Sequence, residues 1–287
     1  MFTVIGIVFG IICVFTGYLL HGGGFAVFIA AWTEFITILG GAFGIFLAGN
    51  GLDAVKAAIA EILHLIKPNS YTRAEYVKLL TMLYQICTLA RREGLLAVEA
   101  HLENPDKSSI LGQNHVFLHD HHAKHFFCDT MKMVVSGGVD PIALADMMEA
   151  DLEIIHAEAL RVPDAIQNTG DAMPAVGIVA CVLGVVITMG RIGGDPAAIG
   201  QAIAVALIGT FLGIFAAYIV FFPLARALNN AHRGSGQYLK CISHVILSIA
   251  KGESPVVCIE FARRNIEPSA RPSFDEMDQA MKNAKKS

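Results

Sequence analysis

Two long stretches of this 287-residue chain contain no acidic, basic or histidine side chain. They cover residues 172–190 and 199–225, and a short hairpin, RIGGDPAA, joins them. Lysine and arginine are also absent from residues 1–49. A bilayer is crossed by roughly 20 mostly apolar residues, so these stretches are long enough to be membrane spans. If the joined pair lines an ion path, the group that binds the ion has to come from elsewhere, which points to a partner.

Other absences limit the class of function. No HExxH pattern or comparable catalytic set lies in an apolar stretch, so we expect neither an enzyme nor a cofactor. The net charge of −4 gives no indication of nucleic-acid binding. The cysteines lack metal-ligand spacing, and a reducing compartment disfavours disulfides, so we expect packing roles for them and no metal site. They are Cys13, Cys87, Cys128, Cys181, Cys241 and Cys258.

Apolar residues dominate what is present: 54% of the chain is hydrophobic and its mean hydropathy is +0.56. Two more apolar stretches open the sequence at 2–20 and 35–49, the second with an alternative start near Phe25. The first lacks the basic region and cleavage site of a secretory signal, so we expect a retained helix. The sequence therefore predicts an all-α polytopic membrane protein with four transmembrane helices and a helical cytoplasmic domain.

The basic residues set the expected orientation. Of 21 lysines and arginines, 20 lie at 56–161 and 226–286. The positive-inside rule places these segments and both termini in the cytoplasm of a bacterial inner-membrane protein, with hairpins at about 21–33 and 191–198 outside. The expected parts are transmembrane helices 1 and 2 (1–49), a cytoplasmic helical domain (50–171), transmembrane helices 3 and 4 (172–227), and C-terminal cytoplasmic helices with a tail (228–287).

Helical periodicity predicts the soluble elements. Apolar residues recur along 74–102 opposite a charged side, which predicts one long half-buried helix that ends at Asn104 and Pro105. Ser273 and Glu276 have the spacing of a capping box and predict the start of a short helix. Further helices are predicted at about 112–135, 141–162 and 228–252.

Small residues recur inside the spans at a four-residue spacing, which lets helix backbones approach closely in a membrane. The pairs are Gly40 with Gly44, and Gly209 with Gly213. This spacing predicts close contacts between helices and by itself indicates no function.

Three residues in the charge-free pair could act in an ion path. Pro174 and Pro223 lie near the cytoplasmic ends of their spans, which suggests a similar membrane depth, and a proline in a helix removes a hydrogen bond and bends it. Ordinary kinks near helix ends are the alternative interpretation, and the residues alone favour it. Thr210 lies near the middle of its span, where its hydroxyl either bonds a carbonyl of its own helix, which the residues favour, or faces an interface.

Glu34 is the one carboxylate near the first two spans. An ionisable side chain within a membrane is a functional candidate. Trp32 stands beside it, however, and tryptophan marks the membrane–water boundary. The sequence favours an interfacial Glu34, with an ion-carrying role as the alternative.

The soluble part contains two candidate surfaces. Residues 114–129 hold five histidines, and the favoured interpretation is a polar helix face that gains charge below about pH 6.5, with a zinc site as the alternative. Arg91, Arg92 and Glu99 lie about two turns apart on the predicted helix at 74–102. A solvated face is the ordinary interpretation, and contacts with a charged partner surface are the alternative. The histidines are His115, His119, His121, His122 and His125.

The chain resembles the MotA/PomA family, the A subunit of the bacterial flagellar stator, over nearly its whole length. The order and spacing of several motifs carry this resemblance. They are GGG at 22–24, LAGNG at 47–51, ARREGLLAVEAHLENP at 90–105, GDAMPAVGIVACVLGVV at 170–186, GTFLGIFAAYIVFFPLA at 209–225 and ARPSF at 270–274.

The resemblance implies a homopentamer in the membrane lipid around a dimer of a MotB-type B subunit, whose helices supply the essential aspartate. It implies that Pro174 and Pro223 couple ion passage to movement and that Thr210 faces this aspartate. Tyr218 and Asp171 lie in matching segments and support the path. Arg91 and Glu99 match the cytoplasmic charges that meet the rotor protein FliG.

Cys181 bears on the question of which ion the chain carries. Sodium-driven members of the family carry threonine at this position, and proton-driven members usually carry a small apolar residue. Sodium requires several hard oxygen ligands, and a thiol is a poor substitute, so the chain is expected to carry H+ in preference to Na+. The main rival is a TolQ/ExbB-type energiser of periplasmic or outer-membrane work, which usually has three spans. A transporter with its own intramembrane site is disfavoured because polar groups are scarce in the spans.

Overall fold

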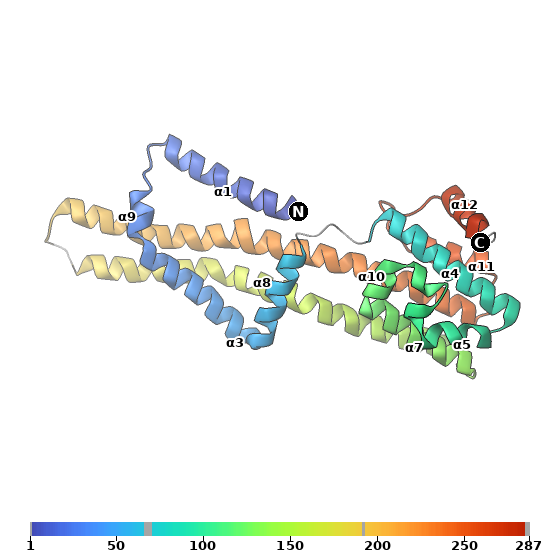
Figure 1. Ribbon diagram of the computed structural model, residues 1–287. Helices are drawn as coiled ribbons and strands as arrows, with labels where there is room; N and C mark the ends of the chain where they lie inside the picture. The colour runs from blue at the N-terminus through green and yellow to red at the C-terminus, as the bar shows by residue number, and fades with distance from the viewer. Residues whose placement is uncertain (1, 66–70, 191–192, 285–287) are drawn as a thin grey trace. The chain divides into compact units, whose positions relative to one another are not determined.

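The computed structural model describes residues 2–65, 71–190 and 193–284. The elements within these ranges are helices, and no β-strand occurs there (Figure 1). Four helices are long and apolar enough to cross a membrane: Phe2–Leu20, Trp32–His64, Pro141–Met189 and Pro196–Ala250. The expected all-α architecture with four membrane-spanning helices is confirmed.

The chain divides into two compact units. Unit 1 comprises Met1–Pro68 and Ala159–Ala231, and unit 2 comprises Asn69–Glu158 and His232–Ser287. Two helices contribute to both units. They are α8 (Pro141–Met189), which is longer than the predicted 141–162 because it continues as the third span, and α10 (Phe222–Ala250).

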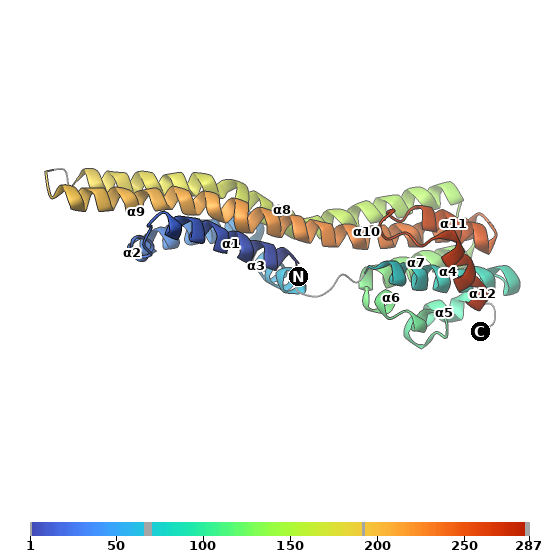
Figure 2. The ribbon, with the colours of Figure 1, turned by 90° about the horizontal axis from the view of Figure 1, so that it is seen from above.

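Unit 1 contains the apolar helices. α8 and α9 (Pro196–Phe215) lie side by side, and α3 (Trp32–His64) crosses them (Figures 1 and 2). The short α2 (Ala26–Ala30) lies in the predicted outer hairpin and packs on α9, where Phe28 contacts Phe211 edge-to-face. α1 (Phe2–Leu20) has no buried residue in this chain alone. The core of this part is Ala31, Ile38, Ala42, Met173, Ala180, Ile208, Leu212 and Ala217.

Three glycines allow α8 and α9 to touch backbone to backbone. A Cβ atom placed on Gly213 would lie 2.6 Å from the Met173 carbonyl oxygen and 2.9 Å from Gly177 Cα. A Cβ on Gly177 would lie 2.8 Å from the Gly209 carbonyl oxygen. The predicted close contact is thus confirmed for Gly209 and Gly213. A Cβ on Gly40 or Gly44 meets no atom within 4 Å, so that pair makes no close contact with the residues that the structure describes.

Replacing Gly213 with alanine should lower the free energy of unfolding of the purified chain by about 1–3 kcal/mol, because backbone atoms cannot move aside for the new methyl group. Denaturant unfolding in detergent measures the change. Gly40→Ala is the matched control, since the space around Gly40 is open. Equal destabilisation by the two substitutions would contradict the backbone contact at Gly213.

Unit 2 is built around α4 (Arg73–Glu93), α5 (Leu96–Glu103), α7 (His121–Ser136) and α11 (Pro255–Arg264). The single long helix predicted at 74–102 is wrong. Gly94 has a φ of +89°, a left-handed conformation that glycine adopts readily and that ends α4. The helix predicted at 112–135 is likewise interrupted: η2 (Leu111–Gln113) and α6 (His115–His119) precede Asp120, which caps α7.

Side-chain caps fix several helix starts in unit 2. The Thr72 and Asp120 side chains accept hydrogen bonds from the backbone N–H groups of Glu75 and Ala123. The predicted capping box begins α12 (Phe274–Ala284): the Glu276 N–H donates to Ser273 Oγ at 3.2 Å, and the Ser273 N–H donates to Glu276 Oε2 at 3.3 Å. The expected short C-terminal helix is therefore confirmed.

The cysteines of unit 2 are packing residues, as the sequence predicts. Cys87, Cys128, Cys241 and Cys258 are buried in its apolar core, and none forms a disulfide. Burial raises the pKa of the Cys128 thiol to about 11 and that of the Cys241 thiol to about 12, so both stay protonated at neutral pH. A protonated buried thiol behaves as a small hydrophobic side chain.

Candidate functional site

The charge-free pair brings three of the predicted path residues onto two touching helices. Pro174 and Cys181 lie on α8 and Thr210 lies on α9, and all three side chains are half-buried. Thr188 and Thr169 donate their hydroxyl hydrogens to carbonyl oxygens one turn earlier in their own helix. Within the described ranges, the Thr210 hydroxyl makes no such bond, contrary to what the residues alone favour. It is free to bond a group outside this chain.

The helix around Pro223 contains a wide turn. The segment η3 (Ala216–Phe221) is π-helical and connects α9 to α10, in which Pro223 is the second residue. Proline has no N–H to donate, and its ring clashes with the carbonyl four residues earlier, which a wider turn relieves. Tyr218 lies in this turn, is 62% exposed, and contacts Phe222 edge-to-face.

Pro174 and Pro223 do not lie at the same height along the paired helices of this chain. A Cβ atom on Gly170 would meet Phe221 and Phe222, so Pro223 lies beside the residues that precede Gly170. Pro174 lies a turn further along α8, next to the Met173–Gly213 contact. The expectation that the two prolines share a level along the paired helices is therefore wrong.

Asp171 is an exposed residue of α8 near the start of the third span. Its Oδ1 accepts a hydrogen bond from the Gln167 side chain at 3.3 Å, one turn earlier. Asp171, Pro174, Cys181, Thr210, Tyr218 and Pro223 all belong to unit 1.

Glu34 is the third residue of α3, and its carboxyl group is buried between helices of unit 1. Its side chain is 8% exposed, and Oε2 is buried without a hydrogen-bond partner among the described residues. Trp32 is 62% exposed and is the first residue of α3, so the expected position of Glu34 at the membrane boundary stays a prediction. A pattern did exist in the sequence: Glu34, Ile38 and Ala42 recur every four residues and form the buried face of α3.

Arg91 and Glu99 lie in unit 2 on different helices, α4 and α5, with the Gly94 break between them. Both are exposed. Arg91 Nη1 donates a hydrogen bond to the Gly252 carbonyl oxygen at 3.1 Å, which fixes one edge of its guanidinium. Both charges are available to an external surface, although they are not on one helix face as the sequence suggested.

The histidine-rich stretch is divided between α6 and α7. Within the described part of the chain, no group of three or more metal-ligating side chains gathers. His115 and His119 stack on α6 with ring centroids 3.8 Å apart, and His121 and His125 pair on α7 at 6.5 Å.

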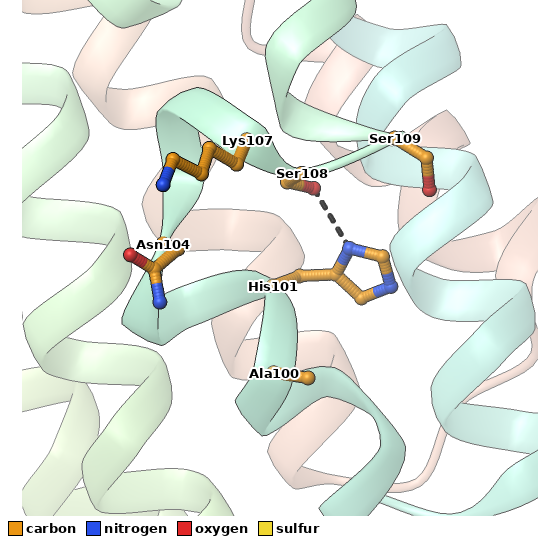
Figure 3. A pocket seen from close by; sticks show the side chains of 6 residues that line it. All are labelled: Ala100, His101, Asn104, Lys107, Ser108 and Ser109. Carbon is orange, nitrogen blue, oxygen red and sulfur yellow. Dashed lines mark hydrogen bonds between the residues drawn. The ribbon is translucent and has the colours of Figure 1, made fainter.

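A polar hollow of about 450 Å³ lies beside α5 (Figure 3). Ser108 Oγ accepts hydrogen bonds from the Ile110 and Leu111 N–H groups at 3.2 and 2.9 Å, so its own hydrogen is left for His101 Nδ1 at 2.7 Å. These hydrogen bonds fix the turn after α5. The residues that line the hollow do not form a catalytic set. The lining residues are Ala100, His101, Asn104, Lys107, Ser108 and Ser109.

The fold and the site together define a polytopic α-helical membrane protein whose candidate path lies at the α8–α9 pair. Comparison with known proteins narrows this class. Residues 4–94 match the family described as motility protein A N-terminal, and residues 119–239 match the MotA/TolQ/ExbB proton channel family.

Curated relatives span the whole chain. Motility protein A of Escherichia coli (strain K12) is 32% identical over 272 residues, which is 95% of this chain and 92% of that protein. Chemotaxis protein LafT of Vibrio parahaemolyticus is 30% identical over 276 residues, covering 96% of each chain. The chain belongs to the motility protein A family.

Solved structures show the same fold. A structure of C. jejuni MotAB has a TM-score of 0.75 at 22% identity and covers 95% of this chain and 98% of that chain. The flagellar MotAB stator complex from Bacillus subtilis has a TM-score of 0.71 at 24% identity, covering 90% and 92%. The matched families are those of motility proteins and proton channels, and with its four long apolar helices the chain is a multi-pass inner-membrane protein.

Proposed function

We propose that the chain conducts protons along the α8–α9 pair and converts the proton-motive force into torque on the flagellar rotor. The observation that carries this proposal is the free Thr210 hydroxyl on a helix pair without any acidic, basic or histidine side chain in 172–190 and 199–225. A MotB-type B subunit dimer supplies the missing aspartate, which Thr210 faces. The names of the two MotAB structures support such a partner.

Five copies of the chain surround the B dimer in this proposal. α1 buries no residue within one chain, and α8 has outward apolar side chains such as Val182 and Ile187. Lipid and neighbouring copies would cover these surfaces. Both termini and unit 2 face the cytoplasm, where Arg91 and Glu99 contact the rotor protein FliG.

The coupling has three steps. A proton from outside neutralises the partner's aspartate near Thr210, which removes the large cost of a bare carboxylate in the membrane. The neutral contact slides past the helix segments at Pro174 and Pro223. Release toward the cytoplasm, supported by Tyr218 and Asp171, restores the charge and completes the cycle.

The chemistry of Cys181 supports protons over sodium. Its half-buried side chain lies on α8 beside Gly209 of α9, where a sodium site would need hard oxygen ligands. A thiol is a soft ligand, so Cys181 does not supply the hard oxygen that threonine offers at this position in sodium-driven members. A proton requires only one acceptor.

Swimming speed tests the proposal in cells that lack their own stators. The chain is expressed alone and then with its B subunit, and external sodium and the proton gradient are varied independently. We expect motility only with the partner, a speed that follows the proton gradient, and no response to sodium.

Sodium dependence would keep the stator function and overturn the argument from Cys181. Absence of motility with a matching partner and rotor would favour the TolQ/ExbB-type energiser. The match of residues 4–94 to the motility protein A N-terminal family stands against that alternative.

A further inference from the structure

Glu34 places a carboxyl group at the junction of three membrane helices. Its neighbours along the buried face of α3 are Ile38 and Ala42, which pack with residues of α8 and α9 in one apolar core. Glu34 Oε2 is buried and has no hydrogen-bond partner within the described residues. The side chain is thus a polar group in an otherwise apolar contact.

The space for this carboxyl is provided by Gly209. A Cβ atom on Gly209 would lie 3.0 Å from Glu34 Oε2, 3.1 Å from Ala180 Cβ and 3.2 Å from the Cys181 backbone nitrogen. Glu34 therefore approaches both α8 and α9 beside Cys181, and Thr210 follows Gly209 directly. Gly209 lies near the middle of the stretch from Pro196 to Pro223, so the carboxyl group at the beginning of α3 meets α9 far from the ends of that stretch.

An ionised carboxylate at this position would be unfavourable. A buried charge without a counter-charge or donor costs several kcal/mol or more. No lysine, arginine or histidine occurs in the apolar segments around it, namely 172–190, 199–225 and 35–49. The arrangement is stable when the carboxyl group carries a proton.

We infer that Glu34 is a second ion-binding residue of the channel, at which each copy of this chain binds a transported proton beside Cys181 and Thr210. The inference rests on the proposed proton-conducting function and adds a carboxyl group from this chain to the one proposed for the partner. The proton converts the carboxylate into a neutral carboxylic acid on arrival and is given up to the next acceptor, so no further reactant is consumed.

The test uses the complete stator complex reconstituted into vesicles that contain a pH-sensitive dye. Glu34→Gln keeps the shape and neutrality of the protonated side chain but cannot take up or release a proton. We expect this variant to assemble in normal yield and to lose most of its proton flux. Asp53→Asn is the matched control on the same helix, because the Asp53 side chain is 97% exposed. Its flux should equal that of the wild type.

A second measurement separates proton binding from a structural role. Infrared difference spectra between the wild type and Glu34→Asp should show the carbonyl stretching band of a protonated carboxylic acid. The frequency of this band should differ between the two proteins, and it should also shift when H2O is replaced by D2O. This comparison retains a carboxyl group in both proteins and so does not depend on the stability of Glu34→Gln.

Normal flux through Glu34→Gln would overturn the inference. So would the absence of a carboxylic acid band that depends on Glu34, even if the flux fell. A wild-type complex without proton flux would instead contradict the proposed function itself, so the two failures are distinguishable.

Discussion

Replacing Pro223 with alanine should abolish rotation of the flagellum while the stator still assembles. Alanine restores an N–H at the second position of α10, so the helix gains the hydrogen bond that proline cannot make. The π-helical turn at Ala216–Phe221 is then no longer needed to accommodate the proline ring. The segment that contains Tyr218 should become a regular α-helix. A helix without this bend cannot move relative to the partner's aspartate as the ion passes.

This result cannot be attributed to a damaged fold. Proline in a helix interior is about 3 kcal/mol less favourable than alanine, so the substitution should leave stability unchanged or raise it. Torque is measured by the rotation of tethered cells, and assembly by co-purification with the B subunit. Pro163→Ala is the matched control, because Pro163 is also inside a helix, α8, but lies outside the proposed path.

Two outcomes would contradict the coupling role of Pro223. One is normal torque in the Pro223→Ala variant. The other is a loss of torque that Pro163→Ala reproduces, since any helical proline would then have the same effect. We expect Pro174→Ala to behave as Pro223→Ala does.

The parts of the fold that follow from local pattern could be predicted from the sequence. Spans require only a long apolar run, and the box at Ser273 and Glu276 requires only two residues three positions apart. Both are present in the structure. The break at Gly94 could not be predicted in this way, because the apolar periodicity continues across it and a positive φ leaves no mark on that periodicity.

The candidate site was harder to predict because its geometry depends on contacts between distant segments. The neighbouring Trp32 gave no sign that the Glu34 carboxyl is buried between helices, where the absence of a side chain at Gly209 leaves room for it. The relative level of Pro174 and Pro223 depends on how α8 packs against α9 and α10, which periodicity does not reveal. The roles of Cys181 and Thr210 involve a partner and stay predictions.

Reversing the charges of Arg91 and Glu99 together should eliminate motility, again without loss of assembly. Each side chain is exposed, and surface substitutions usually change stability by no more than about 0.5 kcal/mol. Complementary charges guide two proteins into the correct orientation when they meet. The double variant, Arg91→Glu with Glu99→Lys, would present like charges to the rotor where opposite charges are needed. Swimming and co-purification with the B subunit measure the two effects.

The single substitutions should have smaller effects than the pair, since the two residues lie on separate helices, α4 and α5, and contact the rotor through separate charges. Lys132→Glu is the matched control, an exposed charge reversal on α7. Charge reversals on the rotor protein that restore the complementary signs should recover motility. Full motility of the double variant, or a failure of every compensating rotor change, would remove Arg91 and Glu99 from the proposed rotor contact.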